Sequence, residues 1–110
     1  MREIKFRITY QHDETEKITQ RDIELGQPIP RLGKRWDVIA KNQYTGLKDK
    51  DGKEMYEGDV VKISWHDKGQ NKQEQISVIS WNGNGYGNVY DNHGYIKEII
   101  GNIYENPELL

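Results

Sequence analysis

The sequence predicts a mainly β fold, either a small barrel or a strongly bent antiparallel sheet, with a strand or hairpin added at the N-terminus. Ile outnumbers Leu by 13 to 5 and Ala occurs once; branched side chains favour strands, whereas Ala and Leu favour helices. Eleven Gly and eight Asn indicate many turns. The N-terminal run "IKFRITY" alternates apolar and polar residues, which is the period of a half-buried strand.

The first expected elements lie in residues 4–44. The alternating run, 4–10, predicts a strand, and the polar stretch that follows it predicts a turn. Residues 18–25 predict either a partner strand or a short helix, whereas 26–34 holds two Pro and two Gly and predicts a loop. Residues 35–44 then predict an extended segment. Its alternation predicts one core-facing side that carries Trp36, Val38, Ala40 and Tyr44.

The stretch "QYTGLKDKDGKEMYEGDVVKI", residues 43–63, holds two acid and glycine pairs and predicts two turns. Asp51 and Gly52 are expected to close a tight hairpin, because Gly has no Cβ and adopts the positive φ that such turns need. Gly58 and Asp59 are expected to turn the chain into the strand "VVKISW". The side chains expected to pack inward are those of Tyr44, Leu47, Met55 and Tyr56.

The last part of the chain completes a fold of five or six short strands. Residues 66–75 predict a solvated loop and 76–81 a strand, and 82–94, which is rich in Gly and Asn, predicts a turn or an irregular ribbon. Residues 95–104 predict a last strand that is bulged or bent at Gly101. The ending "ENPELL" predicts one helical turn with Asn106 as its cap and Pro107 at its first position.

We expect one domain, 1–110, in which an N-terminal β subdomain, 1–42, can pack on a barrel formed by 43–110. The succession of "EGDVVKI", a loop and "ISVISW" is similar to the meander of an SH3-like barrel. Cys is absent, which excludes disulfides and thiolate metal sites. No apolar run is long enough to span a membrane, and the alternating start is unlike a signal peptide, so we expect a cytoplasmic protein.

No motif in the sequence predicts catalysis or a cofactor, and we expect a protein that is not an enzyme. The three His are scattered, and no helix is expected after "GNGYG", as a phosphate-binding loop would require. Turn formation is the favoured interpretation of the acidic residues at 49–59. The alternative is a metal-dependent hydrolase, which would have to gather Asp49, Asp51, Glu54, Glu57 and Asp59 around one point.

The segment 31–48 is basic, with five Lys or Arg against a single acid, although the net charge of the chain is −2. Lys34, Arg35, Trp36 and Lys41 are therefore a candidate binding surface, because cations and aromatic rings together can hold single-stranded nucleic acid. The favoured alternative is that the aromatic rings of this segment face the core while its charges face water.

Three stretches of the chain resemble the YopX family of phage and prophage proteins: "MREIKFR", "QYTGLKDKDGKEMYEGDVVKI" and "IIGNIYENPELL". Asp51 and Met55 stand where the family usually has Asn and Ile. The resemblance implies a mainly β protein that is encoded by a phage or prophage, and it implies no catalytic residue. Family positions without an assigned role are occupied by Tyr44, Thr45, Gly46, Leu47, Asp49, Gly52, Tyr56, Glu57, Gly58, Asp59, Gly101, Asn102, Tyr104 and Glu105.

We therefore expect a non-enzymatic binding or assembly module without a cofactor. Its expected partners are a second copy of itself, in a small homo-oligomer, or a phage or host protein, because oligomers bury surface that a short chain cannot bury alone. The alternative function is an accessory protein that binds single-stranded nucleic acid, which we favour less. We expect no membrane partner.

Overall fold

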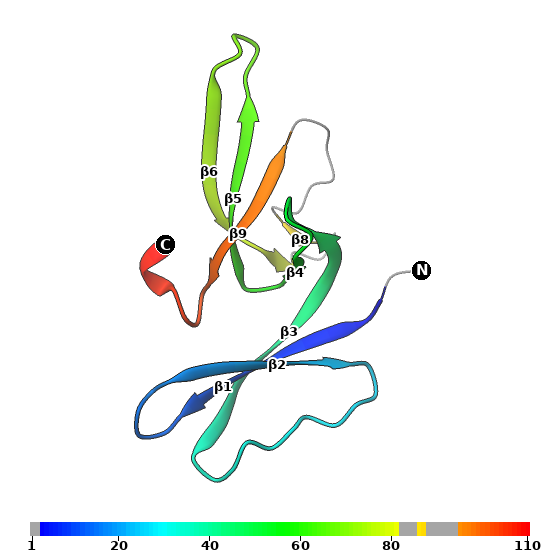
Figure 1. Cartoon of the computed structure of the whole chain (residues 1–110), viewed down its shortest axis with the longest axis vertical. Coiled ribbons are helices and arrows are strands. Elements are labelled where there is room, and N and C mark those ends of the chain that lie inside the picture. The colour runs from blue at the N-terminus through cyan, green and yellow to red at the C-terminus, as the bar shows by residue number, and fades with distance from the viewer. Residues whose placement is uncertain (1–2, 82–85, 88–94) are drawn as a thin grey trace.

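The computed structural model describes residues 3–81, 86–87 and 95–110, and this part of the chain is mainly β, as predicted (Figure 1). Its elements are β1 (Lys5–His12), β2 (Ile18–Glu24), β3 (Trp36–Lys48), β4 (Glu54–Tyr56), β5 (Asp59–His66), β6 (Lys72–Val78), β7 (Ser80–Trp81), β8 (Tyr86–Gly87), β9 (Ile96–Asn102) and the 3-10 turn η1 (Pro107–Leu109). The predicted "GNGYG" loop and His93 fall mostly outside the described residues.

The strands form two main antiparallel sheets. The first has the order β2-β1-β3-β4, the second has the order β6-β5-β9, and β7 and β8 make a short ribbon. Across the described residues the strands do not close into a barrel. The buried apolar residues form two separate clusters, one on β1 and β2 of the first sheet and one between β4 and the second sheet, so they do not share a single interior. An SH3-like relationship of the second sheet stays a prediction.

The long strand β3 joins the two halves of the molecule (Figure 1). Its first part pairs with β1, and its last part pairs with β4. The strand bends at Gly46, whose φ of 89° lies in the left-handed region that glycine tolerates. The expected subdomain division at residue 42 therefore lies inside a continuous strand.

The buried apolar residues form two small cores. Ile8, Tyr10 and Ile23 are buried on the first sheet. The other cluster joins Met55 of β4 to Val61, Ile63 and Ile79 in and beside the second sheet. Of the residues predicted to pack inward, Tyr44, Met55 and Tyr56 are buried and Leu47 is half-buried, which confirms the prediction for the first three.

Residues 18–25 contain a strand that pairs with β1, which is one of the two predicted alternatives. Other predicted boundaries were wrong. Strand β6 begins at Lys72, inside the predicted loop, because this polar edge segment pairs with β5 residue by residue. The predicted strand 76–81 is divided between β6 and β7. Asn106 does not cap η1 with its side chain, whose Oδ1 instead accepts the N–H of Asn102, 3.2 Å away.

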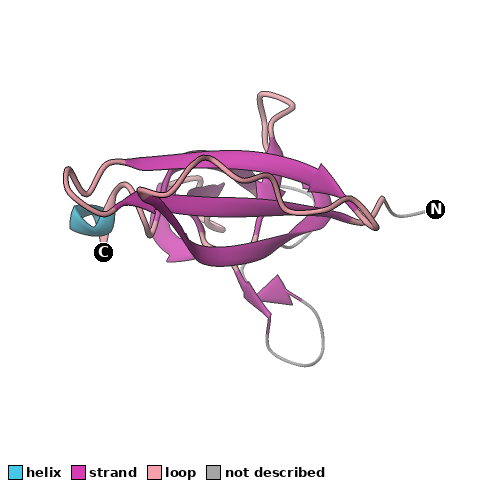
Figure 2. Ribbon diagram, turned by 90° about the horizontal axis from the view of Figure 1, so that it is seen from below, coloured by secondary structure: helices cyan, strands magenta, loops and turns pink. Residues whose placement is uncertain are grey.

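Two further features bear on the site. The register of β5 and β9 shifts between Val60 and Val61, opposite Gly101 and Ile99, so of the bulge or bend predicted at Gly101 the bulge is observed. The connection between β2 and β3 crosses the lower face of the first sheet (Figure 2). No helix in the described part of the chain has the length and apolar character needed to cross a membrane.

Candidate binding face of the first sheet

The strand register divides the side chains of β1, β2 and β3 between two faces, because directly paired residues point to the same side of a sheet. We name the face covered by the β2–β3 connection the loop-side face. The other face lies against the second sheet. The loop-side face carries Phe6, Ile8, Tyr10, His12, Thr19, Arg21, Ile23, Trp36, Val38, Lys41 and Gln43.

A bulge in β3 changes the predicted alternation. Tyr10 pairs with Val38 but Thr9 pairs with Ala40, so Ile39 is an extra residue. The expectation that Trp36, Val38, Ala40 and Tyr44 share one face is therefore wrong. Trp36 and Val38 lie on the loop-side face, whereas Ala40 lies on the opposite face. The same shift brings Lys41 onto the loop-side face beside the ring of Phe6, whose centroid is 4.5 Å from the Lys41 Nζ.

The β2–β3 connection is held on this face by an apolar and a polar contact. Leu32 packs against the buried cluster of Ile8, Tyr10 and Ile23, and the hydroxyl of Tyr10 donates a hydrogen bond to the carbonyl of Pro30. Burial raises the pKa of Tyr10 further above its ordinary value, so the protonated hydroxyl that donates this hydrogen bond is favoured.

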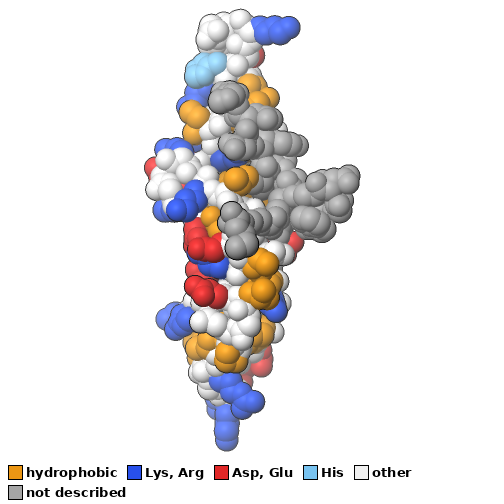
Figure 3. All heavy atoms as spheres, turned by 90° about the vertical axis from the view of Figure 1, so that its right-hand side faces the viewer, with side chains coloured by type: hydrophobic (Ala, Val, Ile, Leu, Met, Phe, Trp, Pro, Cys, Tyr) orange, Lys and Arg blue, Asp and Glu red, His pale blue; other side chains and the backbone are white. Residues whose placement is uncertain are grey.

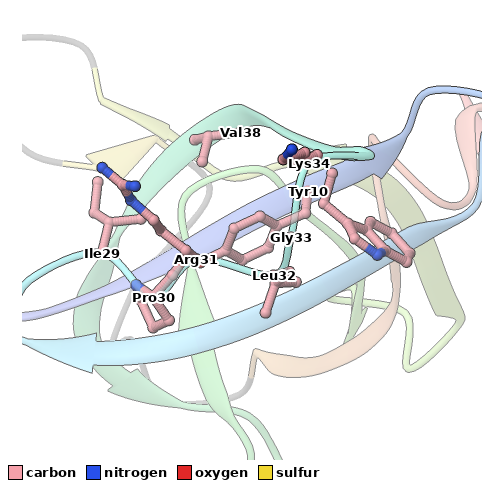
Figure 4. A pocket seen from close by; sticks show the side chains of 9 residues that line it. Tyr10, Ile29, Pro30, Arg31, Leu32, Gly33, Lys34 and Val38 are labelled. Carbon is pink, nitrogen blue, oxygen red and sulfur yellow. The ribbon is translucent and has the colours of Figure 1, made fainter.

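Between this connection and the sheet lies a half-open cavity of about 530 Å³ (Figure 4). Figure 4 shows the side chains of Arg31 and Lys34 on the two sides of Val38. Val38 and Ile29 remain 49% and 42% exposed, so the cavity offers apolar surface to a ligand. A volume of this size is within the range of ligand sites in general, about 300–1,000 Å³. The lining residues are Tyr10, Ile29, Pro30, Arg31, Leu32, Gly33, Lys34, Trp36 and Val38.

The two charged residues that line the cavity, Arg31 and Lys34, are both cations. Arg21, Arg31, Lys34 and Lys41 are exposed, and none of them forms an ion pair with a described residue. Neither the loop-side face nor the connection 25–35 contains an Asp or Glu. Figure 3 shows Lys and Arg side chains at the lower end of the molecule, over the first sheet. Because the protein has a net charge of −2, this is a local positive field.

The opposite face of the same sheet is built differently. There Arg7 pairs with Asp22, with the Nε and Oδ1 atoms 3.0 Å apart, and Lys5 pairs with Glu3 and Glu54. Cations on that face therefore have carboxylate partners from the chain itself. The cations of this face are therefore paired within the molecule, whereas the cations of the loop-side face can bind an anion from outside.

The predicted surface residues are only partly brought together. Lys34 and Trp36 line the cavity, and Lys41 lies farther along the same face. Arg35 instead pairs with Glu14 and Asp13 of the β1–β2 hairpin. The sequence analysis did not identify Arg21 and Tyr10 as residues of this site. The alternation in "TQRDI" and "RITY" nevertheless indicated which side of its strand each of them occupies. Arg31 belongs to the basic segment but was not among the four predicted residues.

Several family positions make contacts that hold the turn 49–53 and the second sheet. Asp49 is 7% exposed, and its Oδ1 accepts the N–H groups of Asp51 and Lys53, both at 2.9 Å, while its Oδ2 accepts that of Ile99 at 3.0 Å. Burial alone would raise the pKa of Asp49, but these three donors lower it below its ordinary value. Gly52 adopts a φ of 81°, as predicted for the turn.

One further family position connects the two sheets, and two others make contacts within the first sheet and the C-terminal turn. The hydroxyl of Tyr104 donates to Asn42 Oδ1 at 3.0 Å, and Gly58, with a φ of 91°, packs beside both side chains. Thr45 Oγ1 donates to the carbonyl of Met55 at 2.8 Å. Asn102 Oδ1 accepts the N–H groups of the two residues at the C-terminal turn, Tyr104 and Glu105.

The acidic residues at 49–59 do not converge on a metal site. No group of three or more His, Cys, Asp or Glu in the described part of the chain is placed to hold a metal ion. Asp59 Oδ2 accepts the N–H of Tyr56 at 2.8 Å, and Asp49 is occupied by the three N–H groups named above. These two carboxylates are therefore used inside the fold.

The model of the family described as YopX protein matches residues 2–110, which is essentially the whole chain. No curated protein matches this sequence.

Proposed function

The chain belongs to the YopX protein family, and we propose that it is a non-enzymatic binding or assembly module that takes an anionic partner on the loop-side face. The observation that carries the proposal is the segregation of charge: Arg31 and Lys34, without ion pairs, line an apolar and aromatic cavity, and Arg21 and Lys41 lie on the same sheet face, whose paired positions carry no carboxylate. Such a field attracts an acidic ligand and orients it before contact.

The family resemblance supports three finer proposals. The protein is encoded by a phage or integrated prophage, it acts in the cytoplasm of the bacterial host, and the second sheet is related to SH3-like folds. Its partner is then a second copy of itself or a phage or host protein with an acidic segment.

The matched pair of variants Arg31→Glu/Lys34→Glu and Lys53→Glu/Lys68→Glu tests the proposal. All four cations are exposed and without a described ion pair, and both variants change the net charge equally, but only the first pair lines the cavity. At low salt, immobilised heparin should retain the wild type and the Lys53/Lys68 variant and release the Arg31/Lys34 variant. A partner from a prophage-induced host should follow the same order. Equal retention and equal capture of all three proteins would overturn the proposal.

Single-stranded nucleic acid is a second candidate, favoured by the common face of Lys34, Trp36 and Lys41. If these cations and Arg31 contact three phosphates in total, affinity for a labelled oligo-dT should fall about 20-fold between 50 and 200 mM salt, through counterion release. Absence of binding at 50 mM salt would eliminate this candidate and leave a protein partner.

A further inference from the structure

The most direct source of an acidic and apolar partner for the loop-side face is the chain itself. Residues 105–110, "ENPELL", which we name the tail, carry two acids and two Leu and no cation. Glu105 and Glu108 are exposed and form no ion pair with a described residue. Leu110 is 68% exposed, more than any other large hydrophobic residue described. The tail thus presents charges and apolar groups that complement those of the cavity.

The tail cannot fill the cavity of its own molecule while the fold is intact. Tyr104 bonds to Asn42, whose side chain points to the face of the first sheet opposite the cavity, because Asn42 pairs with Arg7. Leu109 is packed against Gly101 of β9. Figure 1 shows the C-terminal turn beside β9, with the first sheet between it and the β2–β3 connection. An encounter between tail and cavity is therefore intermolecular.

We propose that the cavity binds the tail of a second copy of this chain, so that molecules associate head to tail. This inference rests on the proposed function, since it names the occupant of the same face. Glu105 and Glu108 would face Arg31 and Lys34, and Leu110 would cover the exposed surface of Ile29 and Val38. The contact is heterologous, so copies close into a ring or continue as an open chain.

The expected affinity is modest. A six-residue segment buries less than the roughly 1,200 Å² of a standard stable interface, so association at micromolar or weaker affinity is expected. The rim charges are exposed, so association should weaken as salt screens them. Sedimentation velocity of the full chain from about 5 μM to 1 mM, at low and high salt, covers this range.

Charge exchange tests the specific pairing. Arg31→Glu/Lys34→Glu and Glu105→Lys/Glu108→Lys should each abolish self-association. An equimolar mixture of the two variants should restore it, because each cavity then meets a tail of opposite charge. The fourfold variant with both exchanges should again associate alone. Leu110→Ser should weaken association at least threefold without changing charge. Lys53→Glu/Lys68→Glu changes residues that neither line the cavity nor belong to the tail, and it should associate like the wild type. Far-UV circular dichroism of each variant confirms that it remains folded.

The outcomes separate this inference from the proposed function. A wild type that remains a 12.9 kDa monomer over the whole range overturns the tail as occupant. Association that survives either double variant, or is not restored in the mixture, overturns it as well, because another surface is then responsible. If heparin in those cases still retains the wild type and releases the Arg31→Glu/Lys34→Glu variant, the loop-side face binds anions and its partner is another molecule. If heparin retains both proteins equally, the proposed function and the tail as its occupant are both wrong.

Discussion

Asp59 and Arg7 form a nearly buried contact between the two sheets, with Asp59 Oδ1 3.5 Å from Arg7 Nη1. Asp59 is 2% exposed, and the Arg7 guanidinium lies 4.0 Å from the ring centroid of Tyr56, whose hydroxyl has no hydrogen-bond partner among the described residues. Burial raises the pKa of Asp59 to about 6, although the Tyr56 N–H and Arg7 both act to lower it. At this contact between the two sheets, folding therefore disfavours the charged form of the Asp59 carboxyl.

This relationship predicts a pH dependence of stability. The pKa of Asp59 is higher in the folded state than the ordinary value near 3.9, so the folded state binds the proton more tightly. The tighter proton binding by Asp59 adds roughly 2–3 kcal/mol to the free energy of unfolding. This stabilisation is fully present below about pH 4 and is lost as the pH rises through about 6. Urea unfolding of wild type and Asp59→Asn from pH 4 to 7 should show a difference in unfolding free energy that changes by this amount. A constant difference would contradict the assignment.

The carboxylate of Asp49 should be a structural anchor with the opposite pH behaviour. Asp49→Ala leaves three backbone N–H groups without their charged acceptor and should cost about 3 kcal/mol. Because folding lowers the pKa of Asp49, its contribution is present above the ordinary pKa and is lost as the pH falls through the lower folded value. Asp51→Ala, in the same turn but exposed, should change stability by less than about 0.5 kcal/mol. Equal melting of the two variants would count against this role.

Gly58 and Gly52 both have positive φ, but only Gly58 has close neighbours. A Cβ at Gly58 would lie 3.4 Å from Tyr104 Cε2 and 3.5 Å from Asn42 Nδ2, whereas nothing lies within 4 Å of one at Gly52. Gly52→Val should cost about 1–3 kcal/mol from backbone strain alone, and Gly58→Val should cost more, because the branched side chain also displaces Tyr104. Thermal melts of both variants measure this. Wild-type stability with loss of partner binding would instead mark the stretch as a binding site.

Gly101 should be intolerant of any side chain. A Cβ at this position would lie 2.5 Å from Asn106 Oδ1 and 2.9 Å from Leu109 Cδ1, so the turn after β9 has to move. Gly101→Ala should cost about 1–3 kcal/mol and release the Leu109 methyl groups from their packed environment, as read from their NMR shifts. Unchanged Leu109 shifts would show that the turn is not held at Gly101.

The sequence predicted the local features of the fold better than their assembly. The alternation of 4–10 predicted β1, and Asp51 and Gly52 predicted their turn, because both signals depend on neighbouring residues. Barrel closure was not predictable in this way, since it depends on how apolar residues divide between two clusters. The candidate site was half predicted: the basic segment was visible, but the bulge at Ile39, which places Lys41 beside Phe6, has no signature in composition or spacing.

The most direct test of the anion-binding face is a map of where a polyanion binds. Amide chemical shifts of the ¹⁵N-labelled full chain, titrated with a heparin-derived tetrasaccharide, should change at Arg21, at residues 29–36 and at Lys41, and these changes should disappear in Arg31→Glu/Lys34→Glu. Changes that cluster on β5 and β6, or none at all at low salt, would contradict the assignment of the loop-side face as the binding surface of this protein.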